Sequence, residues 1–104
     1  REVVVGPPHW NGVWALPKLK LPADPNLIVT VHYYEPFKFT HQGASWAPED
    51  VRKLSGVKWE GTEAELKALR KSFDDAAAWA KKHNRPVFLG EFGAYEKADL
   101  ESRA

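Results

Sequence analysis

Three short apolar runs, separated by long connections, constrain the fold of this 104-residue chain more than any other feature of the sequence. The runs cover Glu2–Gly6, Leu27–Tyr33 and Pro86–Leu89. Apolar strands that alternate with long connections are typical of consecutive βα units in a parallel sheet. We therefore predict an α/β fold with about three parallel strands, the last of them buried.

One long helix is predicted between the second and third strands, from about Glu63 to His83. Thr62 and Glu65 have the spacing of a capping box at its start, and Asn84 marks its end. Apolar residues spaced three or four apart form a stripe that we expect to pack against the sheet. The members of this stripe are Leu66, Leu69, Phe73, Ala76, Ala77 and Ala80.

The other two connections are richer in turn-forming and aromatic residues. The turn-rich stretch Pro7–Gly12 is followed by Val13–Leu16, which we expect to form one helical turn that Pro17 ends. From about Glu35 to Gly61 the sequence predicts a long irregular loop with many Trp, His, Gly and Pro residues. Loops of this length in a compact fold tend to be functional.

Composition excludes several classes of partner. The net charge is +1, and basic and acidic residues are interspersed, which argues against a nucleic-acid or anionic membrane surface. No apolar run approaches the roughly 18 residues of a membrane span. Cys is absent, and the four His residues, at positions 9, 32, 41 and 83, lack metal-ligand spacing. We therefore predict no metal site and no cofactor.

A carboxylate at the end of the third apolar run is the first candidate for catalysis. Glu91 follows the run and lies between Gly90 and Gly93. In (β/α) barrels a polar residue at the carboxyl end of a strand is usually catalytic, and flanking glycines leave room for a close approach. The alternative interpretation is a strand-end Glu that pairs with an Arg or caps a helix.

Polar and aromatic side chains also gather at the far end of the second run. His32 and Tyr34 are two residues apart, so they are expected to point to the same face of the strand. Glu35 alternates to the opposite face and precedes Pro36, so we reject it as a second catalytic acid.

The order of these motifs resembles the family 5 glycoside hydrolases, the endo-β-1,4-glucanases. The segments His32–Pro36 and Phe39–Trp46 are similar to the sixth-strand region of that family, and Gly90–Gly93 is similar to its seventh-strand nucleophile motif. The resemblance covers nearly the whole chain. It implies a segment of a (β/α)8 barrel, because a complete barrel needs about 250 residues. Residues 1–104 are then one partial catalytic domain.

The resemblance implies catalytic roles for three residues. Retaining hydrolysis needs two carboxyl groups about 5 Å apart, and Glu91 would be the nucleophile of the pair. Tyr34 would orient Glu91 through its hydroxyl, and His32 would support the pair by hydrogen bonding. The alternatives are a core tyrosine with a satisfied hydroxyl and a packed structural histidine. The acid/base Glu of the family lies in an Asn-Glu-Pro motif that this chain lacks.

The resemblance also implies substrate contacts in the long loop. His41 would contact substrate near the point of cleavage, and Trp46 would form part of the cleft wall, where aromatic platforms bind sugar rings. Gln42 is a weaker candidate for the same role. Trp46 could instead be a loop anchor packed under the surface.

The stretch after the first strand supplies the remaining candidates for substrate binding. His9, Trp10 and Asn11 are expected on the same rim as the other strand ends, although simple packing of the loop would also explain them. Trp14, Trp59 and Trp79 look structural, and partial burial is enough to explain Trp79.

The sequence thus predicts a segment of a retaining endo-glycosidase that hydrolyses internal β-1,4 bonds of cellulose or related β-glucans. Secretion follows from the family resemblance. Without the acid/base Glu, the isolated chain should be inactive or nearly so. With its sheet edges unpaired, it should be ordered only when completed by the rest of the barrel or by self-association. The alternative function is an inactive carbohydrate-binding or assembly fragment.

Overall fold

The computed structural model describes residues 1 to 104 and divides into two compact units. Unit 1 consists of Arg1–Tyr33 and Arg70–Glu91, and unit 2 consists of Tyr34–Leu69 and Phe92–Ala104. Each unit has its own cluster of buried hydrophobic side chains.

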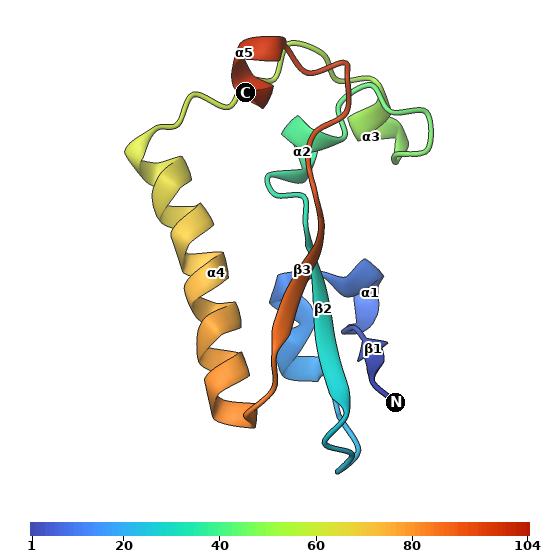
Figure 1. Cartoon of the computed structure of the whole chain (residues 1–104). Coiled ribbons are helices and arrows are strands. Elements are labelled where there is room, and N and C mark those ends of the chain that lie inside the picture. Colours follow the sequence, from blue (N-terminus) through green and yellow to red (C-terminus); the bar gives the residue numbers. More distant parts are fainter. The chain divides into compact units, whose positions relative to one another are not determined.

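Unit 1 is built on a three-stranded parallel sheet with the strand order β1-β2-β3 (Figure 1). The strands are β1 (Val3–Val5), β2 (Leu27–Tyr33) and β3 (Val87–Phe92). In the parallel pairing of β1 with β2, Val3 lies opposite Leu27 and Val5 lies opposite Val29. On the other side of β2, the N–H of Val29 donates to the carbonyl of Pro86 at 3.0 Å. The prediction of an α/β fold with parallel strands is confirmed.

Three helical segments accompany this sheet: α1 (Pro8–Asn11), the 3-10 helix η1 (Val13–Lys18) and the long helix α4 (Glu63–His83). Helix α4 begins and ends where the sequence predicts. The expectation that Pro17 ends its helical turn is wrong, because Pro17 lies inside η1. The fixed φ of proline, near −65°, falls within the range of a 3-10 helix, so η1 accommodates it.

The predicted capping box is present at the start of α4. The N–H of Glu65 donates to Thr62 Oγ1 at 3.2 Å, and the N–H of Thr62 donates to Glu65 Oε1 at 3.1 Å. The hydroxyl of Thr62 is also the main cause that lowers the pKa of the Glu65 carboxyl. At the other end, Asn84 adopts a left-handed φ of 49°, which stops the helix.

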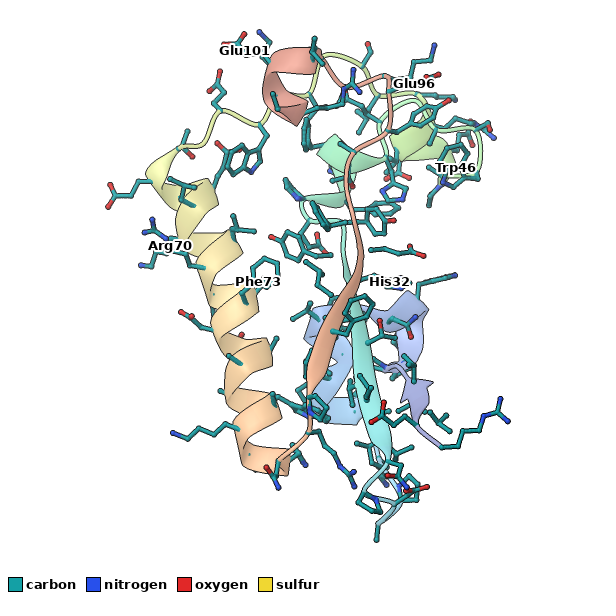
Figure 2. All side chains as sticks on the ribbon, in the orientation of Figure 1. His32, Trp46, Arg70, Phe73, Glu96 and Glu101 are labelled. Carbon is teal, nitrogen blue, oxygen red and sulfur yellow. The ribbon has the colours of Figure 1, made fainter.

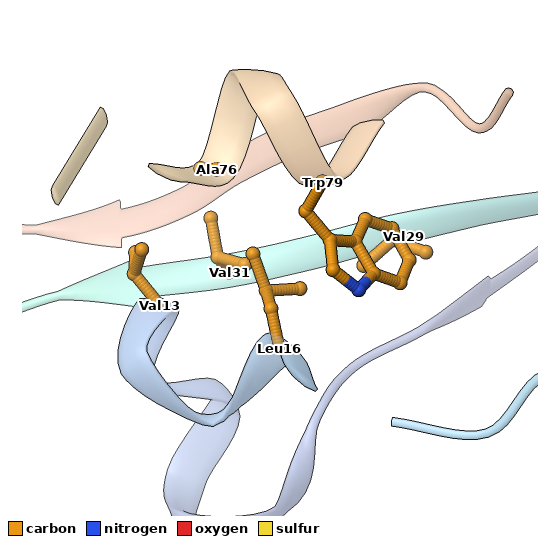
Figure 3. Close-up of a cluster of buried hydrophobic side chains, with 6 residues drawn as sticks. All are labelled: Val13, Leu16, Val29, Val31, Ala76 and Trp79. Carbon is orange, nitrogen blue, oxygen red and sulfur yellow. The ribbon is translucent and has the colours of Figure 1, made fainter. Parts of the chain in front are cut away.

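Helix α4, η1 and β2 enclose the core of unit 1 (Figure 3). Trp79 and Ala76 extend from α4, and they meet Val29 and Val31 of β2 together with Leu16 of η1. Trp79 is only 8% exposed, so it is a core residue rather than a partly buried one. The indole of Trp79 is the largest side chain in this cluster, and its position defines which face of α4 is buried.

The predicted apolar stripe of α4 is therefore partly wrong. Ala76 is buried and Ala80 is half-buried, but Ala77 is exposed because Trp79 occupies the buried face instead. Phe73 is 36% exposed, and its ring contacts Tyr33 at a centroid distance of 5.1 Å. Leu66 and Leu69 are half-buried.

The expectation that Pro86–Leu89 forms a buried strand is also wrong for this chain. Val87 and Leu89 pack against the core, whereas Phe88 and Phe92 are exposed. A parallel strand is buried on both faces only where other elements cover both, and the core side is the covered face of β3. The alternation of side chains therefore leaves an apolar surface on the opposite face.

Unit 2 contains the long loop that follows β2, and this loop is more regular than predicted. It includes the short helices α2 (Phe37–Thr40) and α3 (Glu49–Arg52), and α5 (Leu100–Arg103) lies near the end of the chain. Ala44, Ala47 and Val51 form the buried cluster of unit 2, with Tyr95 packed against it.

Loss of the Thr62 hydroxyl should destabilise α4, because one N–H of the first turn then lacks its acceptor. In a synthetic peptide that spans residues 58–86, we expect Thr62→Ala to destabilise the helix by about 0.5 to 1 kcal/mol and so to reduce its helix content. Circular dichroism of the wild-type and Thr62→Ala peptides measures the difference. Thr62→Ser, which keeps the hydroxyl, is the matched control; equal helix content in all three peptides would show that the cap contributes nothing.

Candidate active site

Strands β2 and β3 bring His32 and Glu91 together. The Nδ1 atom of His32 lies 3.3 Å from Oε2 of Glu91. The side chain of Glu91 is 54% exposed and that of His32 is 19% exposed, so an accessible carboxylate lies beside a largely covered histidine. The side chain of His32 is labelled in Figure 2. Glu91 lies within β3 rather than beyond its end, so the strand ends at Phe92, three residues later than predicted.

Gly90 allows β3 to approach β2 closely at this point. A Cβ atom at Gly90 would lie 2.5 Å from Oγ1 of Thr30 and 3.5 Å from the ring of His32. Contacts as short as 2.5 Å do not occur for real Cβ atoms, so any larger residue would displace its neighbours. The glycine before the carboxylate is therefore required by packing.

The stretch after β1 has a strained backbone at all three predicted binding residues. His9, Trp10 and Asn11 have φ values of 59°, 55° and 62°. Each left-handed residue costs about 1–2 kcal/mol, and such strain tends to persist at functional sites. The turn is closed by the N–H of Gly12, which donates to the carbonyl of His9 at 3.2 Å.

The side chains of this strained turn have different surroundings. Trp10 is 89% exposed. The ring of His9 stacks on Trp14 at 5.0 Å, and Asn11 packs where a Cβ atom of Gly6 would lie. His9 and Asn11 thus have packing contacts, whereas Trp10 presents its indole to solvent. Trp14 is itself largely exposed, and Lys18 Nζ lies over its ring, 5.3 Å from the centroid.

In unit 2, two of the predicted site residues lie together. The rings of Tyr34 and His41 meet edge to face at 5.2 Å, and Phe37 stacks on His41 at 4.2 Å. Burial lowers the pKa of His41, and the charge of Glu35 opposes this effect. His41 is therefore a half-buried imidazole that favours its neutral form.

Two residues that the sequence did not single out hold this region together. The hydroxyl of Thr40 lies 2.8 Å from Nδ1 of His41 and 2.7 Å from the carbonyl of Tyr34. The N–H of Tyr95 donates to the carbonyl of Thr40 at 2.7 Å. The ring of Tyr95 meets the ring of Trp46 edge to face, with a centroid distance of 4.8 Å. The sequence offered one signal for each residue: Thr40 directly precedes the candidate His41, and Tyr95 follows Glu91 by four residues.

Trp46 and Gln42 differ from each other in exposure. Trp46 is 65% exposed, so it is not an anchor packed under the surface, and Figure 2 labels its side chain. Gln42 is fully buried, and its amide donates to the carbonyls of Phe39 and Val57 at 2.9 and 2.8 Å. Its Oε1 atom accepts from the N–H of Val57 at 3.0 Å. The suggestion that Gln42 binds substrate is therefore wrong, because both polar atoms of its side chain are hydrogen-bonded within unit 2. Trp59 is half-buried.

The structure shows no further centre of reactive side chains. No group of three or more His, Asp or Glu side chains could hold a metal ion. None of the helices combines the length and the apolar character needed to cross a membrane.

Comparison with known proteins gives consistent matches. The family model described as cellulase (glycosyl hydrolase family 5) matches residues 1–104. Endoglucanase H of Acetivibrio thermocellus is 35% identical over 99% of this chain and 10% of its own length. Cellodextrinase A of Ruminococcus flavefaciens is 31% identical over 95% of this chain and 29% of its own length.

Solved structures agree with these sequence matches. A hyperthermophilic endo-β-1,4-glucanase in complex with substrate is 51% identical, with a TM-score of 0.92 over 99% of this chain and 33% of its own. Thermotoga maritima Cel5A in complex with cellobiose is 48% identical, with a TM-score of 0.92; the match covers 98% of this chain and 33% of the Cel5A chain. These relatives are (β/α)8 barrels, so the chain has the fold of a barrel segment. It spans about a third of the two solved chains and less than a third of the two curated relatives named above.

This likeness makes a test protein available. We define the grafted barrel as the hyperthermophilic endo-β-1,4-glucanase in which residues 1–104 replace the matching third.

The lowered pKa of His41 should be visible in a pH titration. In NMR spectra of the grafted barrel, the ring signals of His41 should titrate below the ordinary histidine pKa, because burial disfavours the charged form. The contribution of the neutral ring to the free energy of unfolding is then fully present above the ordinary histidine pKa. This contribution is lost as the pH falls through the pKa of the folded state. Glu35→Gln should lower the pKa of His41 further. A rise in that pKa on removal of Glu35 would contradict the assigned cause.

Proposed function

The chain belongs to the cellulase family, glycosyl hydrolase family 5, and we propose that it supplies the nucleophile of a retaining endo-β-1,4-glucanase. The proposed nucleophile is Glu91. The observation that carries this proposal is the contact of 3.3 Å between His32 Nδ1 and Glu91 Oε2, on adjacent parallel strands, with the carboxylate exposed. A nucleophilic carboxylate must be reachable and held in direction, and this pair meets both conditions.

In the proposed reaction, a carboxylate oxygen of Glu91 bonds to the anomeric carbon of the bound sugar. The bond from that carbon to the leaving glycosidic oxygen breaks, and a general acid protonates the oxygen. Water then attacks the anomeric carbon of the glycosyl–enzyme ester, the deprotonated general acid takes up the proton of the water, and Glu91 leaves as a carboxylate. The general acid comes from outside this chain, because the Asn-Glu-Pro motif of the family is absent from the 104 residues.

Two further side chains are proposed to act on Glu91. His32, whose Nδ1 lies 3.3 Å from Oε2 of Glu91, is proposed to donate a hydrogen bond from Nδ1 and so to fix the direction of the carboxylate. Tyr34 is proposed to orient Glu91 through its hydroxyl, a role that rests on the family resemblance.

The proposed substrate is a β-1,4-linked glucan, such as cellulose, or a related mannan. Solved structures of Thermotoga maritima Cel5A contain cellobiose or mannotriose, which supports this choice. Sugar rings have apolar faces, and the exposed indoles of Trp46 and Trp10 are surfaces on which such faces can stack. His41 adds a hydrogen-bonding edge. His9 and Asn11 are proposed to support Trp10, and secretion of the protein is proposed from the family.

A second candidate function follows from the exposed apolar side chains of the sheet. Val3, Val4, Phe88 and Phe92 are all largely exposed in this chain. Such a surface favours association, and the chain spans about a third of the solved relatives. We propose that the isolated chain is an inactive fragment whose partner is the remainder of a barrel or a second copy of itself.

Replacement of the proposed nucleophile tests the enzyme function. In the grafted barrel, we expect Glu91→Gln to lower the hydrolysis of carboxymethylcellulose by about 10³-fold or more, because an amide cannot form the ester intermediate. The wild-type barrel should first release the product anomer with retained configuration, which NMR detects.

Glu96→Gln is the matched control, since Glu96 is an exposed glutamate five residues further along the chain. This control should keep full activity. Near-full activity of Glu91→Gln, with the control unchanged, would remove Glu91 from the mechanism.

The fragment function predicts the behaviour of the isolated chain. The 104-residue chain should not hydrolyse carboxymethylcellulose, and its mass in sedimentation should rise with concentration as exposed apolar surface is buried. Phe88→Ser with Phe92→Ser should reduce this association. A concentration-independent monomer with slowly exchanging amides throughout would exclude the dependence on a partner.

A further inference from the structure

Thr40 is a buried residue whose polar atoms all have contacts within unit 2. Its Oγ1 atom lies 2.7 Å from the carbonyl oxygen of Tyr34 and 3.3 Å from that of Phe37. The same oxygen lies 2.8 Å from Nδ1 of His41. Only 5% of Thr40 is exposed, so water does not compete for these contacts.

The hydroxyl proton decides the direction of these hydrogen bonds. A threonine hydroxyl has one proton to donate, and carbonyl oxygens can only accept. If that proton pointed toward His41, the carbonyl of Tyr34 would face a second oxygen at 2.7 Å with no proton between them. The proton therefore lies toward the carbonyls, and Oγ1 accepts a hydrogen bond from His41. The proton of the neutral imidazole is then on Nδ1.

We propose that Thr40 is a positioning residue that fixes the tautomer of His41, so that Nε2 is presented to the substrate as a hydrogen-bond acceptor. The group recognised at Nε2 is then a hydroxyl that donates, as the hydroxyls of a sugar do. This inference rests on the proposed function, in which His41 contacts the glucan.

The surroundings of the ring hold it in one plane. Phe37 stacks on His41 with an interplanar angle of 23°, and Tyr34 meets its edge at 77°. Thr40 is itself fixed through its backbone, since its carbonyl accepts from the N–H of Tyr95 at 2.7 Å. Glu35 is the charged group that acts on the ring, and its carboxylate accepts from the N–H of Phe37 at 3.3 Å.

A spectroscopic test reads the tautomer directly. Nitrogen-15 NMR of histidine-labelled protein distinguishes protonated from unprotonated ring nitrogens, first in the 104-residue chain and then in the grafted barrel. His41→Gln identifies the signals by their loss. We expect Nδ1 of His41 to carry the proton in the wild type and in Thr40→Ser. In Thr40→Val, which has nearly the same shape but lacks the hydroxyl, Nε2 should become protonated in a large fraction of molecules.

Two spectroscopic outcomes would overturn the inference. One is a wild-type His41 with its proton on Nε2, a result that needs no variant to fold. The other is an unchanged tautomer in Thr40→Val.

Kinetics of the grafted barrel separate this inference from the proposed function. Loss of one hydrogen bond should raise KM for a soluble cello-oligosaccharide about 2- to 10-fold in Thr40→Val, with a smaller change in kcat and recovery in Thr40→Ser. Normal kinetics of His41→Ala would refute the proposed substrate contact. Impaired His41→Ala with normal Thr40→Val would refute only the positioning role.

Discussion

The alternation of side chains along β2 is the constraint on which the rest of unit 1 depends. Val29 and Val31 point into the core formed with Trp79, so this face of β2 is buried and stabilises unit 1. The residues between and after them, Thr30 and His32, lie next to Gly90 of the neighbouring strand. A shift of one residue in the register of β2 would exchange the two faces and place a histidine in the hydrophobic core. Packing by α4 thus also fixes where the polar side chains emerge.

The pair formed by His32 and Glu91 combines a sheltered group with an accessible one. The imidazole is mostly covered, which limits its motion, whereas the carboxylate is more than half exposed. Gly90 makes this arrangement possible, because a side chain there would push β3 away from Thr30. The geometry of this pair therefore depends on a residue without a side chain as much as on the histidine and the glutamate themselves.

Local sequence signals predicted the elements whose ends are chemically marked. The bounds of α4 were predictable because a capping box starts the helix and a left-handed Asn stops it. The end of β3 was not, since the apolar run stops at Leu89, whereas the strand continues through Gly90, which allows a close contact between strands. Burial along α4 also differed from the pattern, because the bulk of Trp79 outweighed the spacing of small residues.

The candidate site shows the same division. The residue types of Glu91, His32 and His41 were visible in the sequence, whereas the role of Thr40 depends on three contacts that the chain makes only after folding. A short polar residue in an irregular loop gives no periodic signal. The carbonyls of Tyr34 and Phe37 come within reach of its hydroxyl only in the folded chain.

The buried amide of Gln42 has a consequence for how this segment can change during evolution. It donates to the carbonyl of Val57 and accepts from its N–H at 3.0 Å, so the ends of the intervening 43–56 stretch are tied together. The entropy cost of closing a loop grows only with the logarithm of its length, and each doubling adds about 0.6 kcal/mol. Ala44, Ala47 and Val51 form the buried cluster of unit 2, so most of this stretch cannot change without loss of packing. Ser55 and Gly56 are exposed, and insertions at this point therefore add length and surface while the clamp and the buried cluster stay in place.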